Sequence, residues 1–128
     1  MDIILYAMPE SVTGQALEKL IEKKSPEIVL NRFSTLQRFI DYMIEHRVEQ
    51  HIVITVVERP KEFIALHSLF ENNDATNLII VCDNTEEMIS LAHELRPRFL
   101  AHGNEILKVM AVVEKMLQMN KIASGDRI

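Results

Sequence analysis

The side chains best suited to chemistry in this sequence each follow an apolar, β-branched segment. Glu58 comes directly after a run that ends at Val57, Asp83 follows a second run, and His102 follows a third. Two carboxylates and an imidazole can together bind a metal ion or act in acid–base catalysis. Polar residues follow the strands of any α/β protein, however, so this spacing alone does not separate a ligand site from ordinary exposed loop residues.

The segments that must position these residues alternate regularly between strand and helix patterns. We predict strands at 2–8, 27–32, 51–57, 78–82 and 98–101, and helices at about 11–23, 34–46, 60–70, 84–96 and 105–119. The first, third and fourth strands are nearly continuous apolar runs, as parallel strands covered on both faces are. Right-handed crossovers then give an α/β fold, a three-layer α/β/α sandwich with a five-stranded parallel sheet in the order 2-1-3-4-5. The carboxyl ends of its strands would bring Glu58, Asp83 and His102 to one possible ligand edge.

Local signals refine this organisation. Ser34 and Gln37 have the spacing of a capping box, and Asn84 with Glu87 has the spacing of a second one. Helical periodicity predicts that Val12 and Ile44 face the core. Residues 72–74 read Asn-Asn-Asp, a turn signal. We predict a single domain at 1–120 and a frayed tail at 121–128.

Composition and charge exclude several classes of function. The 128 residues are 48% hydrophobic and 26% charged, with a net charge of −5 and one cysteine. An acidic chain without a basic patch does not predict direct binding to nucleic acid or to an anionic membrane. Three glycines argue against a Gly-rich phosphate loop, and we expect no cofactor. A lone cysteine and the lack of a signal-peptide pattern predict a cytoplasmic protein.

This pattern, to about Met119, resembles the receiver domain of bacterial response regulators. Element order and spacing support the resemblance, as do Pro60 shortly after the third strand and the break after the fifth strand. Receivers transfer a phosphoryl group to their own aspartate. The resemblance implies an acidic pair after strand 1 that holds Mg²⁺, an acceptor Asp at the end of strand 3, a Ser or Thr after strand 4 and a Lys after strand 5.

None of these positions carries the residue that the resemblance implies. The acidic pair falls on Ala7 and Met8, and neither side chain offers the hard oxygen ligands that Mg²⁺ needs. The remaining positions fall on Val56 (Thr55 or Val57 with a shift of one residue), on Cys82 and on His102. The sequence is therefore similar to a degenerate receiver, a pseudo-receiver, that lacks the phosphoacceptor aspartate. Glu58 lies two residues beyond the acceptor position, and glutamate is a poor acceptor in this family.

Two functions remain open. The first is a non-catalytic, receiver-like signalling module in a two-component-type system, which binds a protein partner or itself as a homodimer. The second is a small-molecule or metal-binding α/β protein with its site at Glu58, Asp83 and His102.

The resemblance also implies a docking face on the fourth and fifth helices and the fifth strand. Four apolar residues there lie at the margin of the predicted core-facing stripes or outside them, and we consider them candidate interface residues: Ile89, Val112, Met116 and Met119. Ile64 on the third helix is a similar outlier, which weakens the case for a single interface.

Overall fold

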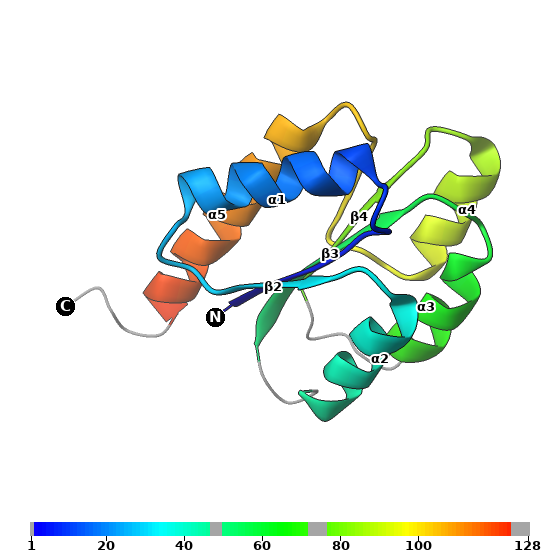
Figure 1. Cartoon of the computed structure of the whole chain (residues 1–128), viewed down its shortest axis with the longest axis horizontal. Helices are drawn as coiled ribbons and strands as arrows, with labels where there is room; N and C mark the ends of the chain where they lie inside the picture. Colours follow the sequence, from blue (N-terminus) through cyan, green and yellow to red (C-terminus); the bar gives the residue numbers. More distant parts are fainter. Residues whose placement is uncertain (1, 47–49, 72–76, 124–128) are drawn as a thin grey trace.

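The computed structural model describes residues 2–46, 50–71 and 77–123, which form ten alternating elements (Figure 1). The strands are β1 (Asp2–Tyr6), β2 (Leu30–Phe33), β3 (His51–Val57), β4 (Asn77–Cys82) and β5 (Phe99–Ala101). The helices are α1 (Val12–Lys24), α2 (Leu36–Glu45), α3 (Glu62–Phe70), α4 (Glu86–Glu94) and α5 (Ile106–Ala123).

The strands form one parallel sheet in the order β2-β1-β3-β4-β5, which confirms the predicted fold class and strand order. Helices α1 and α5 cover one face of the sheet, and α2, α3 and α4 cover the other (Figure 1). All seven residues of β3 are buried, because this strand is central and has helices on both sides.

Successive residues of each strand point to opposite faces, so the sheet separates two apolar clusters. Leu5 and Val56 belong to the cluster under α1 and α5. Tyr6 and Phe39 belong to the cluster under α2, α3 and α4, where their ring centroids are 5.4 Å apart. The core thus places the strand ends, and the loops that follow them, at one edge of a rigid sheet.

The two predicted capping boxes are each wrong by one residue. Thr35, not Ser34, precedes α2, and its side chain makes no capping hydrogen bond. Thr85, not Asn84, precedes α4, where its hydroxyl accepts a hydrogen bond from the amide of Met88. Ser and Asn are good caps wherever a helix begins, so the residue type alone did not fix the starting residue.

Other expectations are corrected at the helix ends and surfaces. Val12 and Ile44, predicted to face the core, are 80% and 50% exposed. The last helix runs through Ala123 rather than ending near Met119. The predicted turn at 72–74 and the tail at 124–128 lie outside the described residues. Within 2–46, 50–71 and 77–123, no helix has both the length and the apolar character needed to cross a membrane.

Helix α1 packs unusually closely on β1. Ser11 caps it by accepting a hydrogen bond from the amide of Gly14 at 3.0 Å. A Cβ atom at Gly14 would lie only 2.4 Å from the Cβ of Ala7. Glycine is therefore required at position 14, and α1 fills the space beside the end of β1.

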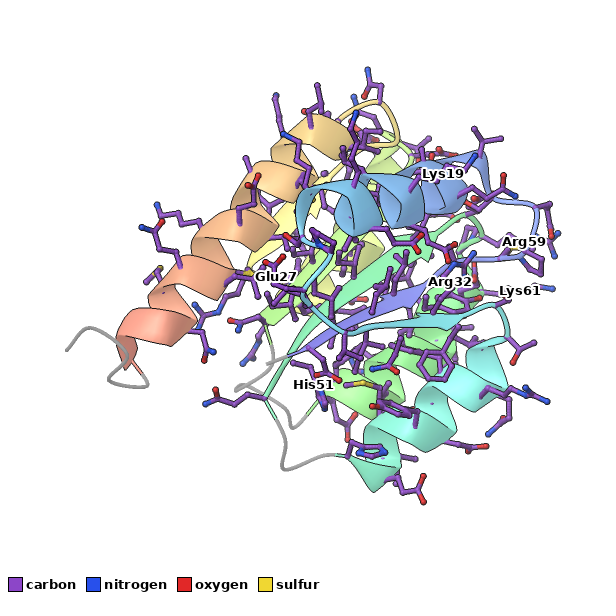
Figure 2. All side chains as sticks on the ribbon, turned by 60° about the vertical axis from the view of Figure 1, so that its left-hand side comes forward. Lys19, Glu27, Arg32, His51, Arg59 and Lys61 are labelled. Carbon is purple, nitrogen blue, oxygen red and sulfur yellow. The ribbon has the colours of Figure 1, made fainter. Side chains whose placement is uncertain are left out.

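At the opposite edge of the sheet, a buried histidine ties β1 to β3. The Nδ1 atom of His51 lies 2.6 Å from Oδ1 of Asp2, whose Oδ2 accepts a hydrogen bond from Asn31. Figure 2 shows His51 far from Arg32, Arg59 and Lys61, which lie toward the strand carboxyl ends. These contacts hold together the amino-terminal ends of β1, β2 and β3. The loops that follow the strands lie at the opposite, carboxyl ends.

Candidate functional site at the strand ends

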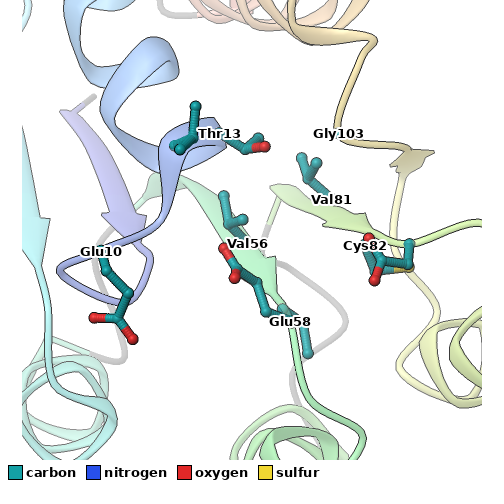
Figure 3. Close-up of a pocket in the computed structure, with 10 residues that line it drawn as sticks. Glu10, Thr13, Val56, Glu58, Val81, Cys82 and Gly103 are labelled. Carbon is teal, nitrogen blue, oxygen red and sulfur yellow. The ribbon is translucent and has the colours of Figure 1, made fainter.

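A hollow of about 300 Å³ opens at the carboxyl ends of β3 and β4. Its lining comes from β3, β4, the first turn of α1 and the loops after β1, β3, β4 and β5 (Figure 3). The lining residues are Glu10, Val12, Thr13, Val56, Val57, Glu58, Val81, Cys82, Asp83 and Gly103. The hollow therefore lies where doubly wound folds usually bind their ligands.

The hollow combines an apolar floor with an acidic rim. Val56 and Val81 belong to the buried core, whereas the side chains of Glu10, Glu58 and Asp83 are exposed. No ion pair within the described part of the chain involves any of these three carboxylates. None of the three rim carboxylates therefore has an ion-pair partner among the described residues.

The predicted ligand edge is brought together only in part. Glu58 and Asp83 both line the hollow, but His102 does not. The Nδ1 atom of His102 lies 3.2 Å from the carbonyl oxygen of Cys82. No group of three or more His, Cys, Asp or Glu side chains is arranged to hold a metal ion among the residues that the structure describes.

Sequence reasoning missed Glu10 and Thr13. They belong to the loop and first turn after β1, and the loop path that brings them to the hollow is not encoded in hydrophobic periodicity. Thr13 also lies close to Gly103, because a Cβ at position 103 would be 3.2 Å from Thr13 Oγ1, a tight contact that requires a small shift of the threonine.

The positions that correspond to the receiver chemistry are apolar and largely enclosed. Ala7 is fully buried and Val56 is 3% exposed, both in the cluster under α1 and α5. Cys82 is also buried, whereas Met8 and His102 are half-buried. Apolar packing, rather than a cage of oxygen ligands, thus surrounds Ala7 and Val56.

A partly buried guanidinium covers the ends of β1 and β2. The Nη1 atom of Arg32 donates to the carbonyl oxygens of Ala7, at 2.7 Å, and of Phe33. Its Nε atom lies 3.4 Å from Oε1 of Glu18, so the two side chains form an ion pair. The same Nε atom is buried and donates no hydrogen bond to a described residue. Arg32 brings a positive charge next to Ala7 and Met8, so it disfavours a second cation there.

The loop after β3 is held by a buried carboxylate. Glu62, 6% exposed, accepts a hydrogen bond at 2.5 Å from the hydroxyl of Tyr6. Its Oε1 atom accepts from the amides of Glu58 and Arg59, each at 3.0 Å. Glu62 therefore sets the position from which Glu58 reaches the rim of the hollow.

The loop after β5 is held in a similar way by Glu105. Its Oε1 accepts from the amide of His102 at 2.9 Å, and its Oε2 accepts from Lys108 Nζ at 2.8 Å. The hydrogen bond from Lys108, followed by that from His102, lowers the pKa of Glu105. The turn that carries Gly103 to the hollow is thus fixed from the start of α5.

Two groups near the site hold their protons more tightly than usual. Burial raises the pKa of the Cys82 thiol to about 11, with a smaller contribution from Asp83. Burial, followed by the hydrogen bond to Glu62, also raises the pKa of Tyr6. Near neutral pH Cys82 is therefore a protonated, apolar part of the wall rather than a reactive thiolate.

These raised pKa values predict a loss of stability at alkaline pH. The unfolded groups release their protons near pH 9.0 for Cys82 and 10.0 for Tyr6, and the folded groups do so only at higher pH. Their contribution is fully present below those values and is lost as the pH rises through the folded pKa values. We expect the urea midpoint to fall from pH 8 to pH 11, as followed by circular dichroism.

Two variants test whether Cys82 and Tyr6 cause this loss of stability at alkaline pH. Cys82→Ala and Tyr6→Phe each remove one titrating group, so each should flatten part of the decline. A decline of equal steepness in both variants and in the parent chain would contradict the assignment.

The four candidate interface residues differ in exposure. Met119 is 58% exposed, while Ile89 is half-buried. Val112 and Met116 pack partly against the core under α5. The interface on α4 and α5 stays a prediction. Larger exposed fractions are found at Val12 on α1, at Ile64 on α3 and at Leu107 at the start of α5.

Comparisons of this chain with protein-family models, with curated proteins and with solved structures find no match.

Proposed function

We propose that this protein is a receiver-like signalling module that works by binding another protein and without phosphorylation. The supporting observation is the pairing of the 2-1-3-4-5 sheet with buried Ala7 and Val56 at the positions of the acidic pair and the acceptor. A phosphoryl acceptor and its Mg²⁺ both require side-chain oxygens. Neither residue supplies one, and the module has no catalytic role of its own.

Arg32 and the rim carboxylates add to this proposal. The guanidinium beside Ala7 replaces a metal ion's positive charge with a fixed one. Glu58 cannot serve as the acceptor in place of Val56, because the backbone around it is fixed by Glu62 and its carboxylate is on the rim beside Asp83. Partner binding in a two-component-type pathway then depends on the surface of the fold, in the monomer or in a homodimer.

The test is an amide NMR spectrum of the full chain with Mg²⁺ alone and then with Mg²⁺ and beryllofluoride, a mimic of aspartyl phosphate. We expect both spectra to match that of the free protein at Met8, Val57, Cys82 and His102. Shifts clustered at these residues only when beryllofluoride is present would contradict a phosphorylation-independent role. Shifts with Mg²⁺ alone would favour cation binding at the strand ends.

The alternative is a small-molecule site at the same edge. The hollow favours it, because its volume is at the lower end of ligand pockets, roughly 300–1,000 Å³. Glu58 and Asp83 remain its candidate ligands, while His102 is directed to Cys82. Comparing the binding of a free polyamine with that of a basic peptide separates this alternative from the protein-binding function. Tighter binding of the polyamine would favour the small-molecule site.

A further inference from the structure

We propose that the hollow at the strand ends docks a basic segment of a partner protein, with a Lys or Arg side chain entering it. The inference rests on the proposed function and adds the face and the chemistry of the partner. Three observations carry it: the shape of the hollow, the carboxylates at its rim that form no ion pair with a described residue, and the exposed apolar side chain of Val12.

The lining matches the two parts of a long basic side chain. Val12 can cover an apolar stem, to which Val56 and Val81 add little contact because they are 3% and 1% exposed. Glu58 and Asp83 can pair with the charged head. Lys and Arg side chains commonly place their stems on apolar surface while the head stays near water or a carboxylate. The volume of about 300 Å³ suits one or two such side chains rather than a nucleotide.

The charge of the site selects a cation over an anion. Glu10, Glu58 and Asp83 form no ion pair within the described residues, and the whole chain has a net charge of −5. An anionic ligand would meet like charges at short range, whereas a basic segment would be steered toward the hollow.

Val12 favours a protein segment over a free small cation. This residue lines the hollow and is 80% exposed, although it lies on the first turn of α1 and was expected in the core. Leu107, at the start of α5 and four residues after Gly103, is also 69% exposed. An apolar residue next to the basic one would cover Val12, while a free amine would leave it in water.

The test is a titration of the full chain with a short capped peptide of lysine, arginine and leucine, followed by amide NMR. Spermine and the same peptide with glutamate for each basic residue are titrated in parallel. We expect shifts at Thr13, Val57, Asp83 and Gly103 with the basic peptide, weaker binding of spermine and none of the acidic peptide. Affinity should fall as salt is added.

Charge reversal locates the contact. Glu58→Lys/Asp83→Lys should weaken peptide binding at least about tenfold, because like charges then face the peptide. Glu22→Lys/Glu114→Lys makes the same change in net charge at exposed positions on α1 and α5 away from the hollow, and should change affinity by less than about threefold. Glu58→Gln/Asp83→Asn is the neutral version if the lysine variant does not fold.

Val12→Ser should also weaken binding, because it removes the apolar contact without changing the charge, and Ile64→Ser is its matched control on α3, where Ile64 is 74% exposed. Equal losses in the hollow variants and their controls would overturn the proposal, as would the absence of shifts with the basic peptide. Equal or tighter binding of spermine would assign the hollow to a small cation instead. The beryllofluoride experiment is independent, so a failed docking site leaves the proposed function standing.

Discussion

Replacing Glu62 with alanine is expected to lower the free energy of unfolding by about 3 kcal/mol. The substitution removes the acceptor of three hydrogen bonds, from the Tyr6 hydroxyl and from the amides of Glu58 and Arg59. The largest part of the cost comes from the Tyr6 hydroxyl, which loses its acceptor and, in a residue that is only 3% exposed, cannot readily hydrogen-bond to water instead. Urea denaturation followed by circular dichroism measures the change.

Two further variants identify the cause of this loss. Glu62→Gln keeps the size and one acceptor oxygen, so we expect roughly half the effect of alanine. Glu58→Ala removes an exposed carboxylate that pairs with no described cation, and should change stability by less than about 0.5 kcal/mol. If Glu62→Ala were no more harmful than Glu58→Ala, the buried carboxylate would not hold the loop after β3.

Placing an aspartate at position 56, where the receiver resemblance implies the acceptor, is expected to destabilise the protein without producing phosphoryl transfer. Val56→Asp should cost about 3–4 kcal/mol, because a carboxylate replaces a residue that is 3% exposed and meets Glu58 and Asp83 nearby. We expect no response to Mg²⁺ and beryllofluoride, since Ala7 and Met8 provide no carboxylate ligand. A response localised to β3 and β4 would show that the acceptor alone had been missing.

The charge on the new aspartate can be separated from its polarity. Burial beside two carboxylates favours the protonated acid in the folded state, so its folded pKa should lie above the unfolded value of about 4. The destabilisation should then be smallest at acidic pH and grow as the pH rises through that folded pKa. Val56→Asn has no ionisable group at position 56, so its destabilisation relative to the parent chain should not change with pH.

The fold could be predicted because its signals are repetitive. Apolar runs such as the one through β3 fix strand positions, and two-sided burial of parallel strands fixes their central place in the sheet. Ser34 and Asn84 are as suitable for capping a helix as Thr35 and Thr85, which follow them directly. The predicted start of each helix was therefore one residue too early. Periodicity also assigned Val12 to the core, although the first turn of a helix can project beyond the sheet it covers.

The candidate site was less predictable for a different reason. Strand ends identified Glu58 and Asp83, since these positions follow from sheet topology alone. Glu10 and Thr13 reach the hollow through a loop path, and His102 turns to the carbonyl of Cys82, a side-chain orientation that hydrophobic periodicity does not encode. Glu62 was missed because a glutamate at the start of a helix is normally solvated, and only the nearby Tyr6 hydroxyl and two loop amides make its burial favourable.

The contact between Gly14 and Ala7 bears on how this sequence can change over generations. An aspartate at position 7 would need space that α1 already occupies, since even a Cβ at Gly14 would lie 2.4 Å from that of Ala7. A mutational path toward metal-dependent phosphoryl transfer would have to move α1, displace Arg32 and replace Val56 together. Val56→Asp alone is expected to be destabilising, so single substitutions that preserve stability leave the protein without that chemistry.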